Sequence, residues 1–237
     1  MNLHDIKIQG DQYRDVYSQQ DYSFASEDVH VYFKNIEEKL INCIASADIV
    51  VGCVAWLTSR RILQALSKKR AIAIVVQKED FLRPDTDSDS RWKETLHNLY
   101  VSLPGGLSRY DDILREMETQ LYCMSSFGNP DIDPIRCVGN HNSERVAAFP
   151  RSHHKFLLFC RGEKRHNGWQ YEWEPYQVWT GSYNLTKNAG MSFENAIVLK
   201  DKQVVKAYFQ EWAQIEALSE PLNWESDWCS PEWRIGS

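Results

Sequence analysis

An imidazole and an ammonium group stand two residues apart in a segment with the pattern of a β-strand. His153 and Lys155 lead into the apolar run 156–159. Because side chains alternate across a strand, His153 and Lys155 share one face and His154 lies on the other. A lysine can neutralise a phosphate oxygen, and a histidine can attack phosphorus or protonate the leaving oxygen. The spacing therefore predicts a site for phosphoryl chemistry.

Further polar residues follow this pair along the chain. The hydroxyl of Ser182 and the amide of Asn184 can donate hydrogen bonds to the same anion. Glu194 offers a carboxylate that can orient an imidazole through one ring nitrogen. The predicted catalytic residues are His153, Lys155, Ser182, Asn184 and Glu194.

In this order the residues resemble the catalytic signature of the phospholipase D superfamily. The matching elements are His153-x-Lys155, Gly181-Ser182-x-Asn184 and Glu194-Asn195. Within the superfamily, the segments 180–187 and 194–199 are most similar to the single-motif bacterial endonuclease branch. The resemblance covers roughly residues 29 to 215 and is strongest from 150 to 200. It implies a phospholipase D-like fold and places Gly181 at the substrate.

Members of this superfamily use two copies of the His-Lys motif, and this chain contains one. The resemblance therefore implies a homodimer with one active site across a two-fold axis. One His153 attacks phosphorus and forms a phosphohistidine, while the partner's His153 protonates the leaving oxygen and then activates water. Lys155, Ser182 and Asn184 hold the phosphoryl charge, and Glu194 fixes the tautomer of a histidine. This chemistry needs no metal and no cofactor.

One position departs from the fuller form of the motif, which has an aspartate where this chain has Cys160. Some nuclease members of the superfamily also lack this aspartate. If Cys160 is buried, it fills space as a small apolar side chain. If it lies near Lys155, its thiol is a candidate reactive group. The sequence leaves both interpretations open.

Composition restricts the class of protein. The chain has 237 residues, of which 43% are hydrophobic, enough for one substantial domain. No apolar run is long enough to span a bilayer, and the first residues lack the form of a signal peptide, so we expect a cytoplasmic protein without membrane insertion. The six scattered cysteines predict free thiols. Their spacing with the histidines matches no zinc pattern, so we expect no metal site.

The net charge of −6 is unusual for an enzyme that acts on nucleic acid, because phosphate binders commonly carry a basic surface. A total charge says little about one groove, however. Arg161, Lys164 and Arg165 follow the predicted catalytic strand. Taken alone, such a cluster is usually a solvated face. Its place beside the phosphate motif predicts that these three residues bind substrate.

The apolar patterns predict the elements that position the site. A run of alternating strands and helices is typical of an α/β protein, and we expect a mixed, largely parallel central sheet flanked by helices. The first elements are a strand at 29–33, a helix at 35–47, a strand at 48–55, a helix capped by Thr58 or Ser59, and a strand at 71–76. Later ones are helices near 91–100 and 109–122, short strands near 135–138 and 145–149, a strand at 196–199 and a helix at 202–218.

These elements predict three regions. Residues 1–28 form a polar lead-in, residues 29–218 form the catalytic domain, and residues 219–237 form a Trp-rich tail. The domain carries insertions at about 78–134 and 162–176. The second insertion, with Trp169, Tyr171 and Trp173, is expected to be a β-hairpin with paired aromatic residues, or else a platform on which bases stack.

Three functions fit these observations. The first is a metal-independent endonuclease acting on DNA or RNA. The second is a phospholipid hydrolase of the cardiolipin-cleaving type, which shares the chemistry but needs an apolar channel. The third is a non-catalytic nucleic-acid-binding or assembly protein, suggested by Cys160 and the acidic balance. We favour the first. The lead-in and the tail are candidate surfaces for a protein partner; the tail, in particular, is expected to dock on the domain or on a second subunit.

Overall fold

The computed structural model describes residues 21–78, 90–108, 112–113, 131–139, 151–166, 168, 171–222 and 224. Its helices are α1 (Ile36–Ser46), α2 (Arg60–Leu66), α3 (Ser90–Val101), α4 (Lys202–Leu218) and the 3-10 helix η4 (Ala189–Met191). Its strands are β1 (Phe24–Ala25), β2 (Val29–Tyr32), β3 (Ile49–Val54), β4 (Ala71–Gln77), β5 (Asp112–Ile113), β6 (Ile135–Val138), β7 (Lys155–Lys164), β8 (Tyr171–Gly181), β9 (Ala196–Leu199) and β10 (Glu220–Pro221).

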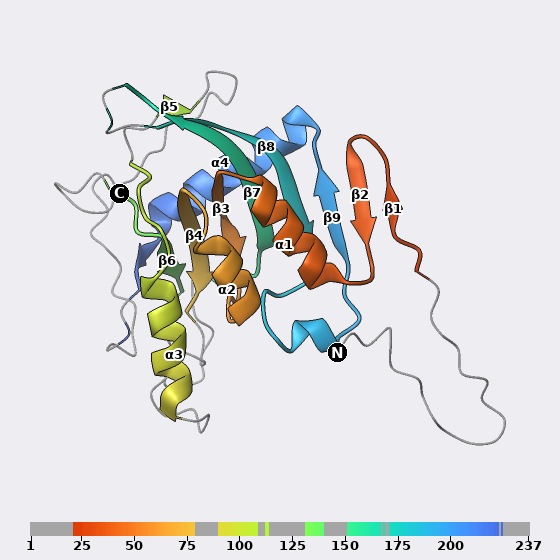
Figure 1. Ribbon diagram of the computed structural model, residues 1–237, viewed down its shortest axis with the longest axis horizontal. Helices are drawn as coiled ribbons and strands as arrows, with labels where there is room; N and C mark the ends of the chain where they lie inside the picture. Colours follow the sequence, from red (N-terminus) through yellow and green to blue (C-terminus); the bar gives the residue numbers. More distant parts are fainter. Residues whose placement is uncertain are drawn as a thin grey trace.

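The strands form one mixed sheet in the order β1-β2-β9-β8-β7-β3-β4-β6-β10, with β5 beside β8 (Figure 1). The prediction of a mixed α/β protein is confirmed, but the prediction of a largely parallel sheet is wrong. Among the strand pairs of the described residues, three are parallel and six are antiparallel. The β7–β8 hairpin and the antiparallel pairing of β7 with β3 account for this, because hairpins join antiparallel neighbours whereas parallel neighbours need a crossover such as α2.

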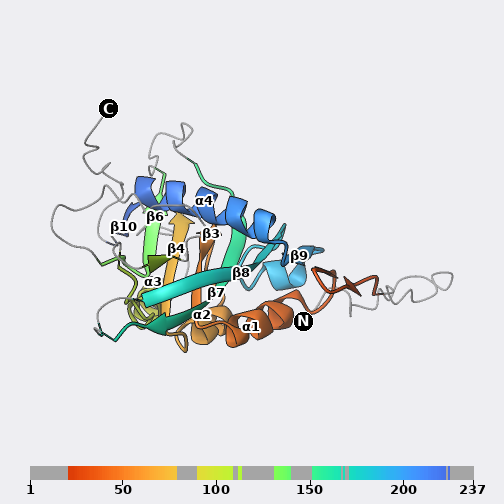
Figure 2. The same cartoon turned by 90° about the horizontal axis from the view of Figure 1, so that it is seen from above.

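Helices cover both faces of the sheet, so the central strands are buried on both sides. Helix α4 lies on one face, and α1 and α2 lie on the other (Figure 2). Every residue of β3 and β4 is buried, which confirms that these continuous apolar runs are interior strands. One apolar core gathers residues of α1, α2 and α3, and the other gathers residues of α4.

Two helices begin where a side chain satisfies their first backbone N–H groups. Ser59 caps α2 by accepting a hydrogen bond from the backbone N–H of Ile62, as predicted. Asp201 caps α4 by accepting from the backbone N–H groups of Gln203 and Val204. These caps fix the faces that the two helices bury.

The sheet extends past both predicted bounds of the catalytic domain, since β1 lies before residue 29 and β10 after residue 218. The helix predicted at 109–122 is wrong at Asp112–Ile113, which form β5 against β8 because the long hairpin offers that strand a free backbone edge. The remaining residues of that helix and the strand predicted at 145–149 lie outside the described residues.

The second insertion is the predicted β-hairpin, and its pairing extends to Lys164 and Tyr171. Trp173 is buried against Phe209 and Trp212 of α4. It therefore belongs to the core and offers no face to a base. Trp169 lies outside the described residues.

The start of the tail packs on the domain. Trp224 has its ring centroid 4.9 Å from that of His97 and 5.5 Å from that of Tyr100, both on α3. This contact confirms the predicted docking for Trp224, while Trp228 and Trp233 lie outside the described residues. In the part of the chain that the structure describes, no helix combines the length and apolar character that crossing a bilayer requires.

Candidate active site

The predicted catalytic residues come from segments that meet at one edge of the sheet. Strand β7 begins at Lys155 opposite the end of β3, and β8 ends at Gly181 opposite the start of β9. Because β7 runs antiparallel to both β3 and β8, its start lies beside the ends of those two strands. The topology thus brings the His-Lys segment and the Gly-Ser-x-Asn segment together.

His153 and Lys155 share one face, as the alternation predicts. The Nζ atom of Lys155 is 3.2 Å from Nδ1 and 3.2 Å from Nε2 of His153, and His153 is exposed. His154 lies on the opposite face, where its Nε2 is 3.3 Å from Oε1 of Glu211 on α4. One imidazole therefore lies exposed beside the ammonium, and its neighbour in sequence is held against the helix.

Ser182 and Glu194 form a hydrogen-bonded pair close to this edge. The Ser182 hydroxyl donates to Oε2 of Glu194 and accepts from the backbone N–H of Asn195 at 3.0 Å. The backbone N–H of Ser182 is 3.1 Å from Oδ1 of Asn195. The carboxylate of Glu194 is thus fixed by Ser182, and its proposed orientation of a histidine stays a prediction.

The electrostatics of Lys155 reflect two opposing effects. Burial lowers the pKa of the Lys155 ammonium below its usual value, and the nearby Glu194 carboxylate raises it by a smaller amount. Glu194 therefore acts on Lys155 through its charge as well as on Ser182 through a hydrogen bond. A negatively charged ligand beside Lys155 favours the protonated form in the same way.

Asn184 and Gly181 complete the predicted set. The Oδ1 atom of Asn184 is buried and accepts no hydrogen bond from any residue that the structure describes. A Cβ on Gly181 would lie 2.3 Å from the backbone oxygen of Asn195, so only glycine allows β8 to approach that segment so closely. Gly181 thus has a steric role, and contact with substrate stays a prediction.

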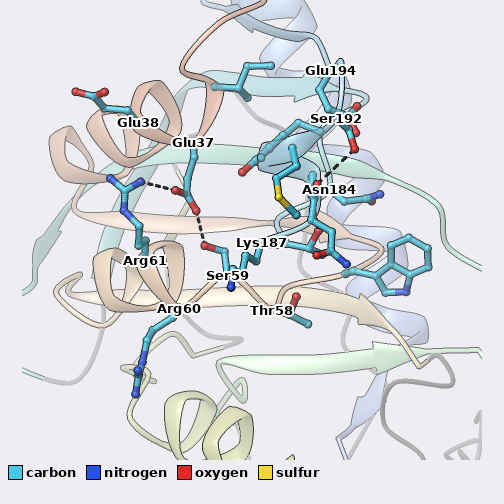
Figure 3. Close-up of a pocket in the computed structure, with 18 of the residues that line it drawn as sticks. Glu37, Glu38, Thr58, Ser59, Arg60, Arg61, Asn184, Lys187, Ser192 and Glu194 are labelled. Atoms are coloured by element: carbon cyan, nitrogen blue, oxygen red, sulfur yellow. Dashed lines mark hydrogen bonds and ion pairs between the residues drawn. The ribbon is translucent and has the colours of Figure 1, made fainter. Parts of the chain in front are cut away.

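A cleft of about 1500 Å³ opens next to these residues (Figure 3). Its lining combines residues near α1, α2 and α3 with the segment 183–194, including Asn184 and Glu194. On one side, the Glu37 carboxylate accepts from the Ser59 hydroxyl at 2.6 Å and pairs with Arg61 at 2.5 Å. These contacts join α1 to α2 and give the cleft a defined wall.

The basic cluster does not reach this edge. Lys164 ends β7 and Arg165 follows it, so at about 3.3 Å per residue they lie about 30 Å from Lys155 along the strand. The guanidinium of Arg161 stacks over the ring of Tyr176 at 4.7 Å. A role for this cluster in binding requires a ligand that extends along the sheet, and it stays a prediction.

Cys160 is fully buried in the core that packs against α4. Burial raises the pKa of its thiol well above the usual value. Five positions of a strand separate it from Lys155, about 17 Å. Cys160 is therefore an apolar space-filler, and the alternative of a reactive thiol near Lys155 is wrong. Across the described residues, no group of three or more His, Cys, Asp or Glu side chains is arranged to hold a metal ion.

Comparison with known proteins places this chain in a family. No family model matches the sequence. The uncharacterized protein L381 of Acanthamoeba polyphaga mimivirus is 32% identical over 209 residues, covering 84% of this chain and 68% of that one. The chain belongs to the same family as this mimivirus protein.

Two solved structures align with most of this chain. NucT from Helicobacter pylori matches with a TM-score of 0.44 and 13% identity, covering 79% of this chain and 96% of that one. Nuc from Salmonella typhimurium, described as a phospholipase D family member, matches with a TM-score of 0.43 and 16% identity, covering 82% and 98%. Structural similarity at these TM-scores and identities is no evidence for the activity of this chain.

Sequence reasoning missed a residue that holds the catalytic segment. Gln77, at the buried end of β4, accepts a hydrogen bond from the backbone N–H of Ser152 at 2.6 Å. The backbone N–H of Ala55 donates to the carbonyl of His154 at 2.8 Å. Gly139, with φ of +91°, leaves room for Gln77, because a Cβ there would lie 2.1 Å from Gln77 Nε2. The only signal in the sequence is a polar residue that ends an apolar strand.

Replacing Gln77 by leucine should impair catalysis more than binding. The substitution leaves the buried N–H of Ser152 without an acceptor, which costs about 1–3 kcal/mol of stability. It also frees the segment that carries His153, and a displacement of about 1 Å can lower kcat by about 100-fold. We expect kcat to fall about 10- to 100-fold with little change in KM. Ser219→Ala, which removes a buried hydrogen bond at the far end of α4, is the control for stability loss alone. An unchanged kcat in Gln77→Leu would contradict this role.

Proposed function

We propose that this chain is a phosphodiesterase that hydrolyses the phosphodiester bonds of nucleic acids by phospholipase D-type chemistry, without a metal. The observation that carries the proposal is the position of Lys155 Nζ, 3.2 Å from both ring nitrogens of an exposed His153. Ser182, Asn184 and Glu194 gather beside the pair at the same edge of the sheet. A nucleophile, a fixed cation and neutral donors are what phosphoryl transfer requires.

In the first step, a ring nitrogen of one His153 attacks phosphorus. A nitrogen–phosphorus bond forms, the bond to the leaving oxygen breaks, and the second histidine donates a proton to that oxygen. The ammonium of Lys155 and the amide of Asn184 stabilise the charge on the non-bridging oxygens in the transition state.

In the second step, water attacks the phosphohistidine. The second histidine, now neutral, takes a proton from the water, and the nitrogen–phosphorus bond breaks. The product is a phosphate monoester, and both imidazoles return to their starting protonation states. The same pair of groups thus serves both halves of the reaction.

The second histidine is supplied by a second copy of the chain. Each chain has one His-Lys motif, and His153 lies exposed at the edge of the sheet rather than in the core. A two-fold axis through this edge would bring each His153 next to the partner's His153. The proposed enzyme is therefore a homodimer whose active site is shared.

The cleft favours a nucleic acid over a phospholipid. Cations line it from α2, α3 and the segment before η4, namely Arg60, Arg61, Arg91 and Lys187. An extended polyanion can contact several cations at once, whereas acyl chains require an apolar channel. These cations, and the ion pair between Glu37 and Arg61 in one wall, are unlike the lining of such a channel.

Incubation of the purified protein in excess EDTA tests the proposal. The substrates are single- and double-stranded DNA and RNA, with cardiolipin vesicles as a parallel arm. We expect cleavage of a nucleic acid in EDTA and none of the lipid. Lipid hydrolysis alone would establish the phospholipase alternative. Binding of nucleic acid with no turnover would establish a binding protein instead.

The pH dependence of activity should report the protonation state of Lys155. Lys155 loses its charge as pH rises through its pKa, which burial holds below the usual value of about 10.4. Activity should therefore fall on the alkaline side at a lower pH than an ordinary lysine would give. Glu194→Gln removes the charge that raises this pKa, so the alkaline limb should move to still lower pH.

The position of the limb is measured as kcat against pH, with bis(4-nitrophenyl) phosphate as substrate. Glu194→Gln also lowers the height of the profile, because Ser182 loses the carboxylate to which it donates. Glu211→Gln, on the opposite face beside His154, is the matched control and should leave the limb in place. Identical limbs in Glu194→Gln and the wild type would disprove the coupling.

A further inference from the structure

Trp56 occupies the junction between the His-Lys pair and the cleft. It lines the cleft, and its ring centroid is 6.5 Å from that of His153 with the ring planes 88° apart. The indole is partly exposed, and its N–H donates no hydrogen bond to any residue that the structure describes. Tryptophans at binding surfaces typically keep such a donor for a ligand.

The backbone around Trp56 is hydrogen-bonded to the segment 183–194, which also lines the cleft. The carbonyl of Trp56 accepts from the N–H of Leu185 at 3.2 Å, and the carbonyl of Leu185 accepts from the N–H of Thr58 at 2.9 Å. The Tyr100 hydroxyl donates to the carbonyl of Leu57 at 2.7 Å and anchors the loop to α3. Trp56 is thus held at a fixed position beside Asn184.

Two cations of the cleft have no counterion among the residues that the structure describes. Arg60 and Lys187 both line it and are exposed. Neither makes an ion pair or a hydrogen bond with any residue in the described part of the chain, whereas Arg61 is paired with Glu37. Two exposed cations that line one cleft from separate segments suit the phosphates of a polymer.

We infer that the cleft binds a single-stranded segment of nucleic acid next to the bond that is cleaved, with one base stacked on Trp56 and phosphates at Arg60 and Lys187. This inference rests on the proposed function and specifies its substrate. A base that stacks on a protein ring must leave its neighbours and its pairing partner. The site therefore selects single strands, and stacking on an indole accepts any base.

Fluorescence anisotropy of labelled 12-residue oligonucleotides tests the inference. All proteins carry His153→Ala, so the probes stay intact. The probes are single-stranded DNA, single-stranded RNA, duplex DNA, and single strands with one abasic position moved along the sequence. One protein keeps Trp56, and this is called the Trp56 protein. The others carry the further substitution Trp56→Ala, Trp56→Phe or Trp224→Ala. Trp224 packs on α3 away from the cleft lining and controls for loss of a tryptophan.

Trp56→Ala should weaken single-strand binding by about 5- to 100-fold, and Trp56→Phe should restore most of it. One abasic position should weaken binding to the Trp56 protein and have no further effect on Trp56→Ala. Duplex binding should be weaker than single-strand binding and insensitive to Trp56. Lys187→Gln should reduce the slope of log affinity against log salt concentration by about 0.7.

Equal single-strand affinities for Trp56→Ala and the Trp56 protein would overturn the inference, as would an equal loss in Trp224→Ala. The proposed function can fail separately. If the expected binding pattern appears but the wild-type protein cleaves nothing, the cleft is a binding site and the chemistry is wrong. If the wild-type protein cleaves single strands and duplexes alike and Trp56 has no effect on binding, the chemistry stands and this inference falls.

Discussion

Replacing His153 by alanine should lower phosphodiester hydrolysis by at least about 10⁴-fold. In the proposed shared site, the substitution removes the nucleophile of one subunit and the general acid of the other, since both roles fall to the same residue. General acid–base catalysis alone contributes about 10²–10⁴-fold, and loss of a nucleophile costs more. The measurement is kcat/KM on an oligonucleotide and on bis(4-nitrophenyl) phosphate.

The adjacent histidine provides a matched control. His154 lies on the opposite face of the strand, where it contacts Glu211 and packs edge-to-face on Phe156. His154→Ala removes an imidazole from the same segment, so it controls for local disturbance of the strand. We expect it to retain activity within a few-fold of the wild type. Equal losses in the two variants would mean that the imidazole of His153 has no chemical role.

Replacing Arg136 by methionine should have the largest effect on stability, about 3–5 kcal/mol of the free energy of unfolding. Arg136 is 3% exposed and joins β6 to the end of α4. Its Nε donates to the Ser219 hydroxyl at 2.7 Å, and its Nη2 donates to the Ser219 carbonyl at 2.6 Å. The carboxylate of Glu216, which is 1% exposed, lies 3.6 Å from Arg136 Nε. Methionine would remove the guanidinium that faces this buried carboxylate.

Urea unfolding followed by circular dichroism measures the loss. Asp133→Asn is the control, because the Asp133 side chain is 52% exposed and lies 3.4 Å from Arg136, so its pair should contribute less than about 1 kcal/mol. The double variant Arg136→Met/Glu216→Leu should recover much of the loss, since it removes both charges. If Arg136→Met were as stable as Asp133→Asn, the Glu216 carboxyl group would have to be neutral or solvated.

Local patterns predicted the elements that pack the core. Neighbouring residues were enough to predict the continuous apolar runs of β3 and β4, the cap at Ser59 and the β7–β8 hairpin. They were not enough to predict the direction in which each strand runs. Strand β2 pairs with β9, about 170 positions away, and no feature of either segment encodes that partner. Sheets assembled from distant strands are therefore predicted less well than the strands themselves.

The residues of the candidate site were likewise predictable from the sequence only in part. Alternation along one strand correctly placed His153 and His154 on opposite faces. The motif grouped Ser182, Asn184 and Glu194, of which Ser182 and Glu194 are hydrogen-bonded to each other. Gln77 and Trp56 act through tertiary contacts, with Ser152 and His153 respectively, which no spacing reveals. The basic cluster is near the His-Lys pair in sequence but far from it in space, because a strand carries its two ends far apart, and its role in binding stays a prediction.

The proposed mechanism depends most directly on a covalent bond between His153 and phosphorus. Single-turnover mixtures of the protein with an oligonucleotide labelled at the scissile phosphate are denatured with alkali, in which phosphohistidine survives, and digested for mass spectrometry. We expect a transient adduct on His153 in the peptide that contains Lys155, absent from His153→Ala and present in His154→Ala. Complete turnover with no adduct on His153 at any time, or an adduct on another residue, would contradict it.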